Sequence, residues 1–102
     1  MTVYKKLVRD GVPEVIRANG QKASTRVLSK EEYHKALTQK LLEECEEFRT
    51  AQTVEELADC LEVVYTLAEQ YGGVEALEKA RREKVEQRGA FKERIFLESV
   101  EG

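Results

Sequence analysis

The chain has 102 residues, of which 17 are basic and 20 acidic, so its formal net charge is −3. That length allows one domain with a modest core. The near balance of charge argues against a general nucleic-acid or membrane binder. Charged residues make up 36% of the chain, above the usual quarter, which is typical of long amphipathic helices. We therefore expect residues 1–102 to form a single domain.

Nothing in the sequence indicates secretion or membrane insertion. Residues 1–6 are followed by charge rather than by the apolar stretch of a signal peptide. The longest run free of charged residues, 63–68, is far too short to span a bilayer. Cys45 and Cys60 do not form the pattern of a disulfide framework. The simplest expectation is a cytoplasmic protein that does not bind membranes.

The first 28 residues contain one short predicted helix. Pro13 suits the first turn of a helix that runs to about Ala18, and the Asn-Gly pair at 19–20 is a stop signal. The following segment, 21–28, is expected to be a linker or a short strand.

The second predicted helix has a stronger start signal. Ser29 and Glu32 form a capping-box pattern, in which each side chain satisfies the backbone N–H of the other residue. From this cap we expect a helix that runs to about Thr50.

Two more helices are predicted after this one. Thr53 and Glu56 repeat the capping pattern and begin a third helix, which we expect to end at the glycine pair 72–73. A fourth helix covers about 74–87, and 91–97 is either a short helix or an extended tail that packs on a neighbour. The expected fold class is all-α, an antiparallel bundle of four main helices.

Two acidic pairs fall on the helix faces that should be buried. At about 100° per residue, Glu44 lies inside the apolar arc of the second helix and Glu47 lies at its edge. On the third helix, Glu56 falls on the apolar side and Asp59 borders it. Each pair has i, i+3 spacing, which places both side chains on one face. The arcs consist of Leu37, Leu41, Cys45 and Phe48 on the second helix, and of Leu57, Cys60, Leu61, Val64, Leu67, Ala68 and Tyr71 on the third.

Four carboxylates gathered at a helix contact indicate a divalent cation, because a buried carboxylate without a partner is costly or becomes protonated. Mg²⁺ or Mn²⁺ prefers oxygen ligands, whereas zinc sites favour Cys and His, and this chain has one His. Two alternatives stay open. Glutamates of a highly charged helix can lie on its apolar flank and reach water. Glu56 is at the N3 position of the Thr53 capping box, so its carboxylate can also turn back to the backbone.

The same residues carry a family pattern. Residues 43–47 fit Glu-Glu-x-x-Glu, and residues 56–59 fit Glu-x-x-Asp. Together they resemble the signature of the all-α nucleoside triphosphate pyrophosphatases, the MazG-like and phosphoribosyl-ATP pyrophosphohydrolase-like enzymes. Residues 4–13 and 88–91 resemble the second of these branches, so the resemblance spans nearly the whole chain.

The resemblance implies a helical bundle that assembles as a dimer or tetramer. It also implies Mg²⁺-dependent hydrolysis of a nucleotide between its α and β phosphates. Residues 65–66 stand where the histidine-pathway enzyme carries a histidine, so we expect nucleotide-pool cleaning rather than histidine biosynthesis. Glu43 belongs to the motif and is given a supporting catalytic role. By motif position, the metal ligands would be Glu44, Glu47, Glu56 and Asp59.

Catalysis also needs a proton acceptor and cationic contacts to the triphosphate. Glu47, at the edge of the acidic group, is the leading candidate to orient the attacking water or take its proton. Lys6 and Arg9 lie in the matched N-terminal segment, and Lys84 and Arg88 share a helix face at i, i+4. Either pair can hold phosphate. The alternative for the second pair is a solvated surface, or pairing with glutamates of the same helix.

The third helix also bears on assembly. Its apolar arc covers more than half of the helical wheel, which is more than one neighbouring helix can bury. We therefore predict a homodimer or homotetramer. A function of another class stays open: an inactive helical dimerisation or regulatory module, whose acidic pairs form salt bridges to lysine or arginine.

Overall fold

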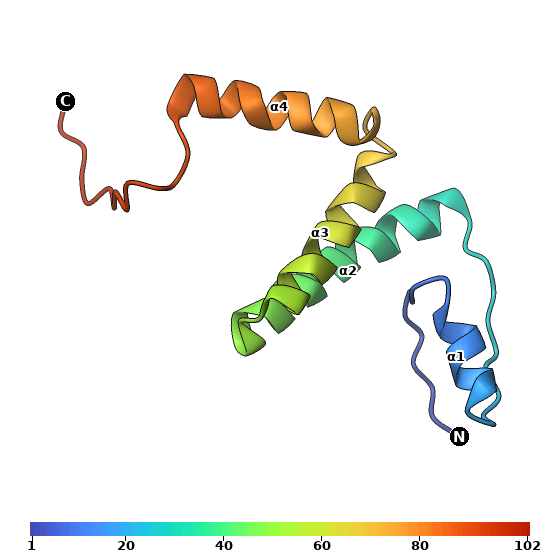
Figure 1. The fold of residues 1–102 in the computed structure, drawn as a ribbon. Coiled ribbons are helices and arrows are strands. Elements are labelled where there is room, and N and C mark those ends of the chain that lie inside the picture. The colour runs from blue at the N-terminus through green and yellow to red at the C-terminus, as the bar shows by residue number, and fades with distance from the viewer. The chain divides into compact units, whose positions relative to one another are not determined.

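Four α-helices and no strands make up the fold (Figure 1). The all-α fold class and the four predicted helices are thereby confirmed. None of these helices has the length and apolar content needed to cross a bilayer. The chain divides into two compact units, Met1–Leu67 and Ala68–Gly102. The computed structural model describes all residues, 1–102, and its helices are α1 (Val12–Ala18), α2 (Lys30–Ala51), α3 (Val54–Ala68) and α4 (Gly73–Arg88).

Helix α1 is short because local signals limit it at both ends. Pro13 lies in its first turn, where a missing backbone N–H costs nothing. The helix ends before Asn19 and Gly20, and the φ of Gly20 is +80°, in the left-handed region. Residues 21–28 have no regular structure, so the linker expected there is confirmed and the short strand is wrong.

The N-terminus of α2 carries the capping box that the sequence predicts. The Glu32 N–H donates to Ser29 Oγ at 3.2 Å, and the Ser29 N–H donates to a Glu32 carboxylate oxygen at 3.0 Å. Arg26 donates two further hydrogen bonds to the same carboxylate, at 2.9 and 3.3 Å. These donors lower the pKa of Glu32 to about 2, and the hydrogen bond from Arg26 is the largest cause. Together they fix the residue at which α2 begins.

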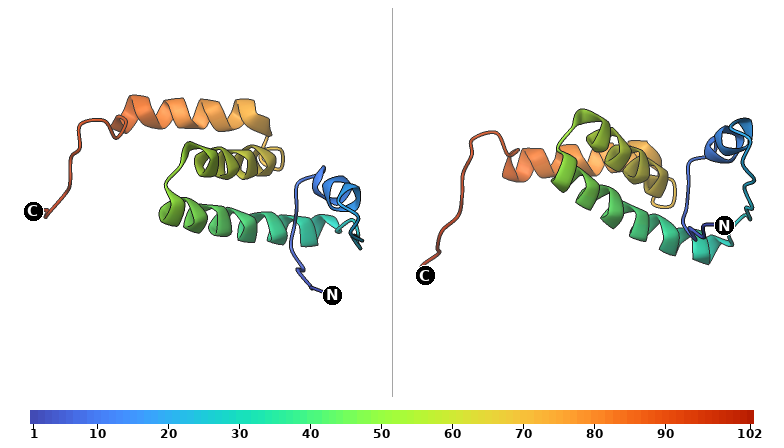
Figure 2. Two further views of the ribbon diagram at one scale, coloured as in Figure 1. Left: turned by 60° about the horizontal axis from the view of Figure 1, so that its bottom comes forward. Right: turned by 90° about the horizontal axis from the view of Figure 1, so that it is seen from below.

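Helices α2 and α3 form an antiparallel hairpin with a two-residue connection, and they lie side by side in every view (Figure 1, Figure 2). Gln52 adopts a left-handed conformation with φ +55°, and its N–H donates to the Phe48 carbonyl at 2.7 Å, which ends α2. Thr53 then accepts the Glu56 N–H at 3.3 Å and begins α3. The connection therefore holds both helix ends with local hydrogen bonds.

The apolar core of the N-terminal unit is small, and its buried apolar side chains are Leu37 and Val63. Cys45, which the sequence places in the apolar arc of α2, is exposed. The reason is rotation: Cys45 lies about 100° round the helix from Glu44, and Glu44 is the residue buried on that face. A second apolar face of α3 stays 39–71% exposed; this α3 stripe consists of Val54, Leu57, Leu61 and Tyr65.

The second unit begins where α3 ends. Helix α3 stops at Ala68, four residues before the predicted glycine pair, and the Tyr71 N–H donates to the Ala68 carbonyl at 2.9 Å in a turn. Gly72 and Gly73 have φ of +97° and +91°, which suits glycine and marks the start of α4 rather than the end of α3. Helix α4 is one residue longer at each end than predicted.

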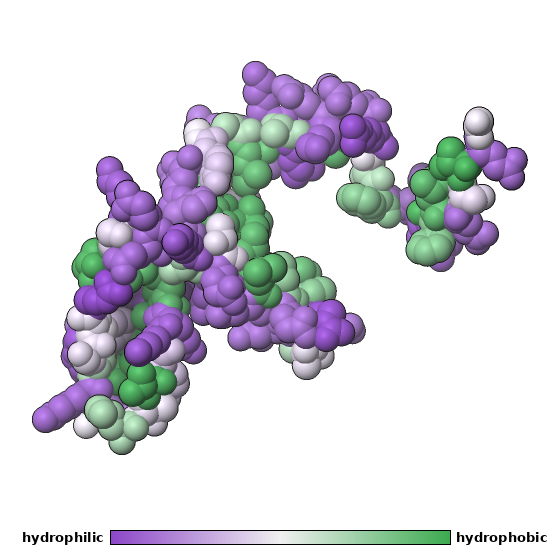
Figure 3. Space-filling model, turned by 180° about the vertical axis from the view of Figure 1, so that it is seen from behind, coloured by the Kyte–Doolittle hydropathy of each residue, from purple (hydrophilic) through white to green (hydrophobic).

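The C-terminal segment follows Gly89 with a turn at 91–93 and then continues without helix or strand. The short helix expected as one alternative for 91–97 is therefore wrong, and packing of the tail on a neighbour stays a prediction. Figure 3 shows a green, apolar group at this end of the chain. The exposed large apolar residues of this segment are 74–101% accessible and comprise Phe91, Ile95, Phe96, Leu97 and Val100.

We expect Ser29→Ala to destabilise the chain by about 1 kcal/mol, because the first turn of α2 loses its side-chain acceptor. Urea unfolding followed by far-ultraviolet circular dichroism measures the change. Ser24→Ala is the matched control, since Ser24 is exposed on the linker outside any helix, and its effect should be close to zero. Equal stabilities of the two variants would contradict the capping role.

Candidate metal centre

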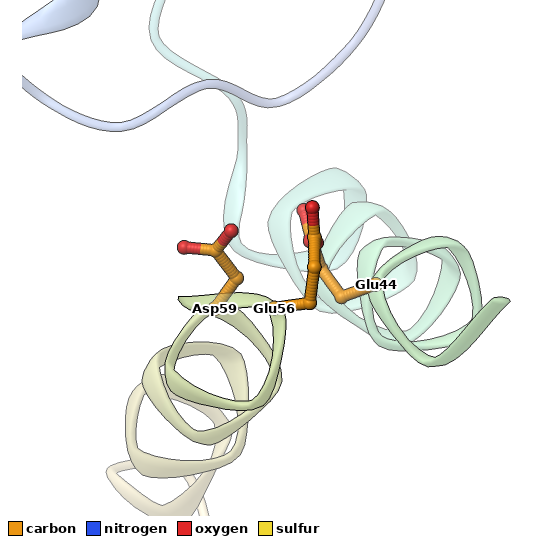
Figure 4. A group of neighbouring side chains, drawn as sticks. All are labelled: Glu44, Glu56 and Asp59. Atoms are coloured by element: carbon orange, nitrogen blue, oxygen red, sulfur yellow. The ribbon is translucent and has the colours of Figure 1, made fainter. Parts of the chain in front are cut away.

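Three of the acidic residues that the sequence selects come together at the α2–α3 contact (Figure 4). One carboxylate oxygen from each of Glu44, Glu56 and Asp59 lies within 4.8 Å of the other two. Glu44 comes from α2, and the other two come from the first turns of α3. Figure 4 shows their carboxylates on the same side of the hairpin. These three residues are called the acidic cluster below.

Glu44 is the most buried member of the acidic cluster. The residue is 7% exposed, and its Oε2 is buried without a hydrogen-bond partner. Glu56 Oε2 is likewise buried and without a partner. An unpartnered buried polar atom is costly, and more so when it carries charge. Two such oxygens in one cluster are the chemistry expected of residues that bind a cation.

Only the backbone of Glu56 takes part in the cap at Thr53, so the capping alternative for its side chain is wrong. The Glu56 N–H does donate to Thr53 Oγ1, at 3.3 Å. The Glu56 carboxylate, however, lies beside that of Glu44, and its Oε2 has no hydrogen bond. The backbone of Glu56 thus serves the cap while its side chain joins the cluster.

Glu47, the fourth predicted ligand, lies next to the acidic cluster rather than within it. Its side chain is exposed. The pKa of Glu47 is raised, first through a hydrogen bond with the Glu44 carboxyl and then through repulsion from Glu44, with a smaller contribution from Glu56. The i, i+3 spacing of the two residues places Glu47 on the same face of α2 as Glu44.

Two cations contact the acidic cluster. Arg9 Nη2 lies 2.6 Å from Asp59 Oδ1, which joins the N-terminal segment to α3 across 50 residues of sequence. Lys40 Nζ lies 3.3 Å from Glu44 Oε1, one turn earlier on α2. Sequence reasoning selected Arg9 but missed Lys40. The signal that could have found Lys40 is its i, i+4 spacing from Glu44.

A cavity of about 260 Å³ lies beside the acidic cluster. Its walls come from residues 7–10 of the N-terminal segment and from α2 and α3, and they include both ion pairs, Arg9 with Asp59 and Lys40 with Glu44. The volume is just below the roughly 300 Å³ at which small-molecule pockets usually begin. The acidic cluster therefore borders this space through Glu44 and Asp59, and Asp10 and Glu62 add two further carboxylates to its lining.

The other predicted site residues lie outside the cluster. Lys6 Nζ is 5.5 Å from the centroid of the Tyr4 ring, a cation–π contact. Glu43 is half-buried on α2 and is not part of the cluster. Lys84 and Arg88 are exposed on α4, in the second unit, and their phosphate-binding role stays a prediction.

Comparison with known proteins finds a relative that matches part of this chain. An uncharacterized protein of Mycolicibacterium smegmatis is 52% identical to it over 48 residues, which cover 47% of this chain and 49% of that protein. The chain thus spans about half the length of this relative. No protein-family model matches the chain, and no solved structure matches it. The resemblance to MazG-like enzymes therefore stays a prediction from the motifs.

We expect Glu56→Gln to stabilise the metal-free chain by about 1 kcal/mol, because it removes one negative charge from the acidic cluster. The unfolding midpoint should rise by a few degrees in the presence of EDTA. Any rise that Mn²⁺ produces in the wild type should shrink in this variant.

Glu55→Gln is the matched control for this change. Glu55 lies in the same first turn of α3 and is exposed, so both variants lose the same favourable interaction with the helix N-terminus. The difference between them isolates the repulsion within the cluster. If the two midpoints moved together, that repulsion would be absent.

Proposed function

We propose that the chain is a Mg²⁺-dependent nucleotide pyrophosphohydrolase, which cleaves a nucleoside triphosphate or a related nucleotide to the monophosphate and pyrophosphate. The observation that carries this proposal is the acidic cluster, with two buried carboxylate oxygens that have no partner. The resemblance of the motifs to MazG-like enzymes supplies the reaction. A housekeeping role in the cytoplasmic nucleotide pool is part of the same proposal.

The residues present fit a hard divalent cation. Glu44, Glu56 and Asp59 would hold it, with Glu47 close by. Their ligand atoms are all oxygen, which suits Mg²⁺ or Mn²⁺. No cysteine or histidine belongs to the cluster, which disfavours zinc. When bound, such an ion supplies positive charge that polarises a phosphate group and offsets the negative charge that develops during hydrolysis.

The chain's own residues supply the remaining chemistry. The exposed Glu47 carboxylate would accept a proton from the attacking water. The water oxygen forms a bond to the α-phosphorus, the bond to the bridging oxygen breaks, and pyrophosphate leaves. Arg9, which lines the cavity, has a planar guanidinium that suits two phosphate oxygens at once.

A second function, the inactive dimerisation or regulatory module, is favoured by the two ion pairs, since Asp59 and Glu44 already have cationic partners. The pairs do not satisfy the whole group, because four carboxylates with Glu47 included face two cations. Glu44 Oε2 and Glu56 Oε2 still lack a partner. An inactive module would show no change in unfolding midpoint with Mn²⁺ or with nucleotide, whereas a bound ligand raises it.

The α3 stripe supports the proposal of a homodimer or homotetramer. Its four apolar side chains, 39–71% exposed, follow one face of α3. The opposite face of the same helix carries Val63, which is buried. A helix with apolar residues on two faces needs two neighbours, and a second copy of the chain would supply one.

Leu61→Glu should convert the oligomer to a monomer, because it places a charge in the centre of the α3 stripe. Size-exclusion chromatography with light scattering measures the mass. Val15→Glu is the control, since Val15 is exposed on α1, outside the stripe, and the oligomer should persist. A wild-type chain that is a monomer at all concentrations would contradict the proposed assembly.

The reaction itself is tested by pyrophosphate release from a panel of canonical and modified nucleoside triphosphates with Mg²⁺. We expect Glu47→Gln and Asp59→Asn to lower kcat at least about 100-fold while the helices persist by circular dichroism. Glu46→Gln is the control, because Glu46 pairs with Arg49 on the exposed face of α2, and its activity should be close to wild type. If the wild-type chain released no pyrophosphate from any nucleotide, the assigned reaction would be wrong.

A further inference from the structure

We propose that Lys40 and Arg9 are exchangeable counter-ions: they hold the cluster's carboxylates in the metal-free chain and contact the substrate's phosphates once a metal ion takes those carboxylates. This inference rests on the proposed function and deepens it. It assigns Lys40, absent from both acidic motifs, as a further substrate-binding residue.

Lys40 is less exposed than most lysines. Its side chain is 21% exposed and its partner Glu44 is 9% exposed by side chain, whereas most lysines are largely exposed. Helix energetics do not explain the pair, since lysine placed four residues before glutamate is the weaker of the two orientations. The location of Lys40 beside the cluster is therefore the feature that requires an explanation.

Arg9 repeats the arrangement from another wall of the same cavity. It reaches Asp59 at 2.6 Å from the N-terminal segment, while Lys40 reaches Glu44 at 3.3 Å from within α2. All four residues line the cavity of about 260 Å³. Two cations thus face one small space, and each is held there by a carboxylate that the proposed metal site also needs.

Metal binding and these ion pairs compete for the same carboxylates, those of Glu44 and Asp59. A divalent ion held by Glu44 and Asp59 would satisfy their charge and repel the ammonium and guanidinium groups beside them. Both cations would then need a new anionic partner. A polyphosphate in the cavity supplies one, and charge-assisted hydrogen bonds to phosphate are among the strong ones.

The exchange predicts effects of opposite sign. Removing the charge of Lys40 or Arg9 removes a competitor of the metal, so the affinity for the metal alone should rise. The same change removes a phosphate contact, so the affinity for polyphosphate should fall. A side chain with a purely structural role would weaken both, because its loss would disturb the hairpin that carries the cluster.

The test titrates Lys40→Gln and Arg9→Gln with Mn²⁺ alone and then with inorganic triphosphate in the presence of Mg²⁺, by calorimetry. We expect several-fold tighter Mn²⁺ binding than in the wild type. Triphosphate binding should be about tenfold weaker or more, the effect of losing one hydrogen bond to a charged group. Lys40→Arg, which keeps the charge, should retain triphosphate binding within a few-fold.

Arg49→Gln is the matched control for Arg9. It breaks the Arg49–Glu46 pair, which has the same 2.6 Å separation but lies on the exposed surface of α2. Lys35→Gln is the control for Lys40, since Lys35 is an exposed lysine of the same helix. Neither control should change either affinity.

The outcomes separate this inference from the proposed function. A wild-type chain that binds no Mn²⁺ would overturn both together. A wild type that binds Mn²⁺ but no triphosphate, or folded variants in which both affinities fall or neither changes, would overturn the exchange alone. Circular dichroism verifies folding, and Lys40→Met, which keeps the apolar stem, replaces Lys40→Gln if that variant does not fold.

Discussion

Repulsion among carboxylates at the α2–α3 contact is the constraint on which the rest of the N-terminal unit depends. The hairpin buries Leu37 and Val63 as its apolar core, and at the same contact it buries Glu44 and one oxygen of Glu56. The surface that joins the helices is therefore also the surface where negative charge collects. Positive charge at this contact offsets the cost of burying these ionised carboxylates.

Charge at the cluster is linked to the position of the N-terminal segment. Arg9 belongs to a stretch without helix or strand, and it is tied to α3 by its contact with Asp59. A change in charge around Asp59 therefore alters the ion pair with Arg9 that holds this segment against the hairpin. An ion pair with both side chains partly exposed is individually weak, so such a link can be broken and remade without unfolding the helices.

The sequence predicted the parts of this molecule that depend on local signals. Each of these signals lies within a few residues: the cap at Ser29, the connection before α3 and the i, i+3 acid pairs. Helix periodicity correctly predicted that Glu44 lies on the buried face. The partners of the cluster were harder to predict. Arg9 meets Asp59 only because the chain folds back across 50 residues, and Lys40 looks like an ordinary surface lysine until its contact with the buried Glu44 is known. The end of α3 was also misplaced, because left-handed glycines at 72–73 serve the following helix.

The two-residue connection between α2 and α3 has a further consequence. It keeps all four acids, from Glu44 to Asp59, within 16 consecutive residues. Closing so short a loop costs little chain entropy, and contacts this close in sequence form early in folding. One residue added to the helix start would turn α3 by about 100° about its axis and carry Glu56 and Asp59 away from Glu44. A change in the length of this connection would therefore disturb the alignment of the carboxylates more than a substitution of Gln52 or Thr53.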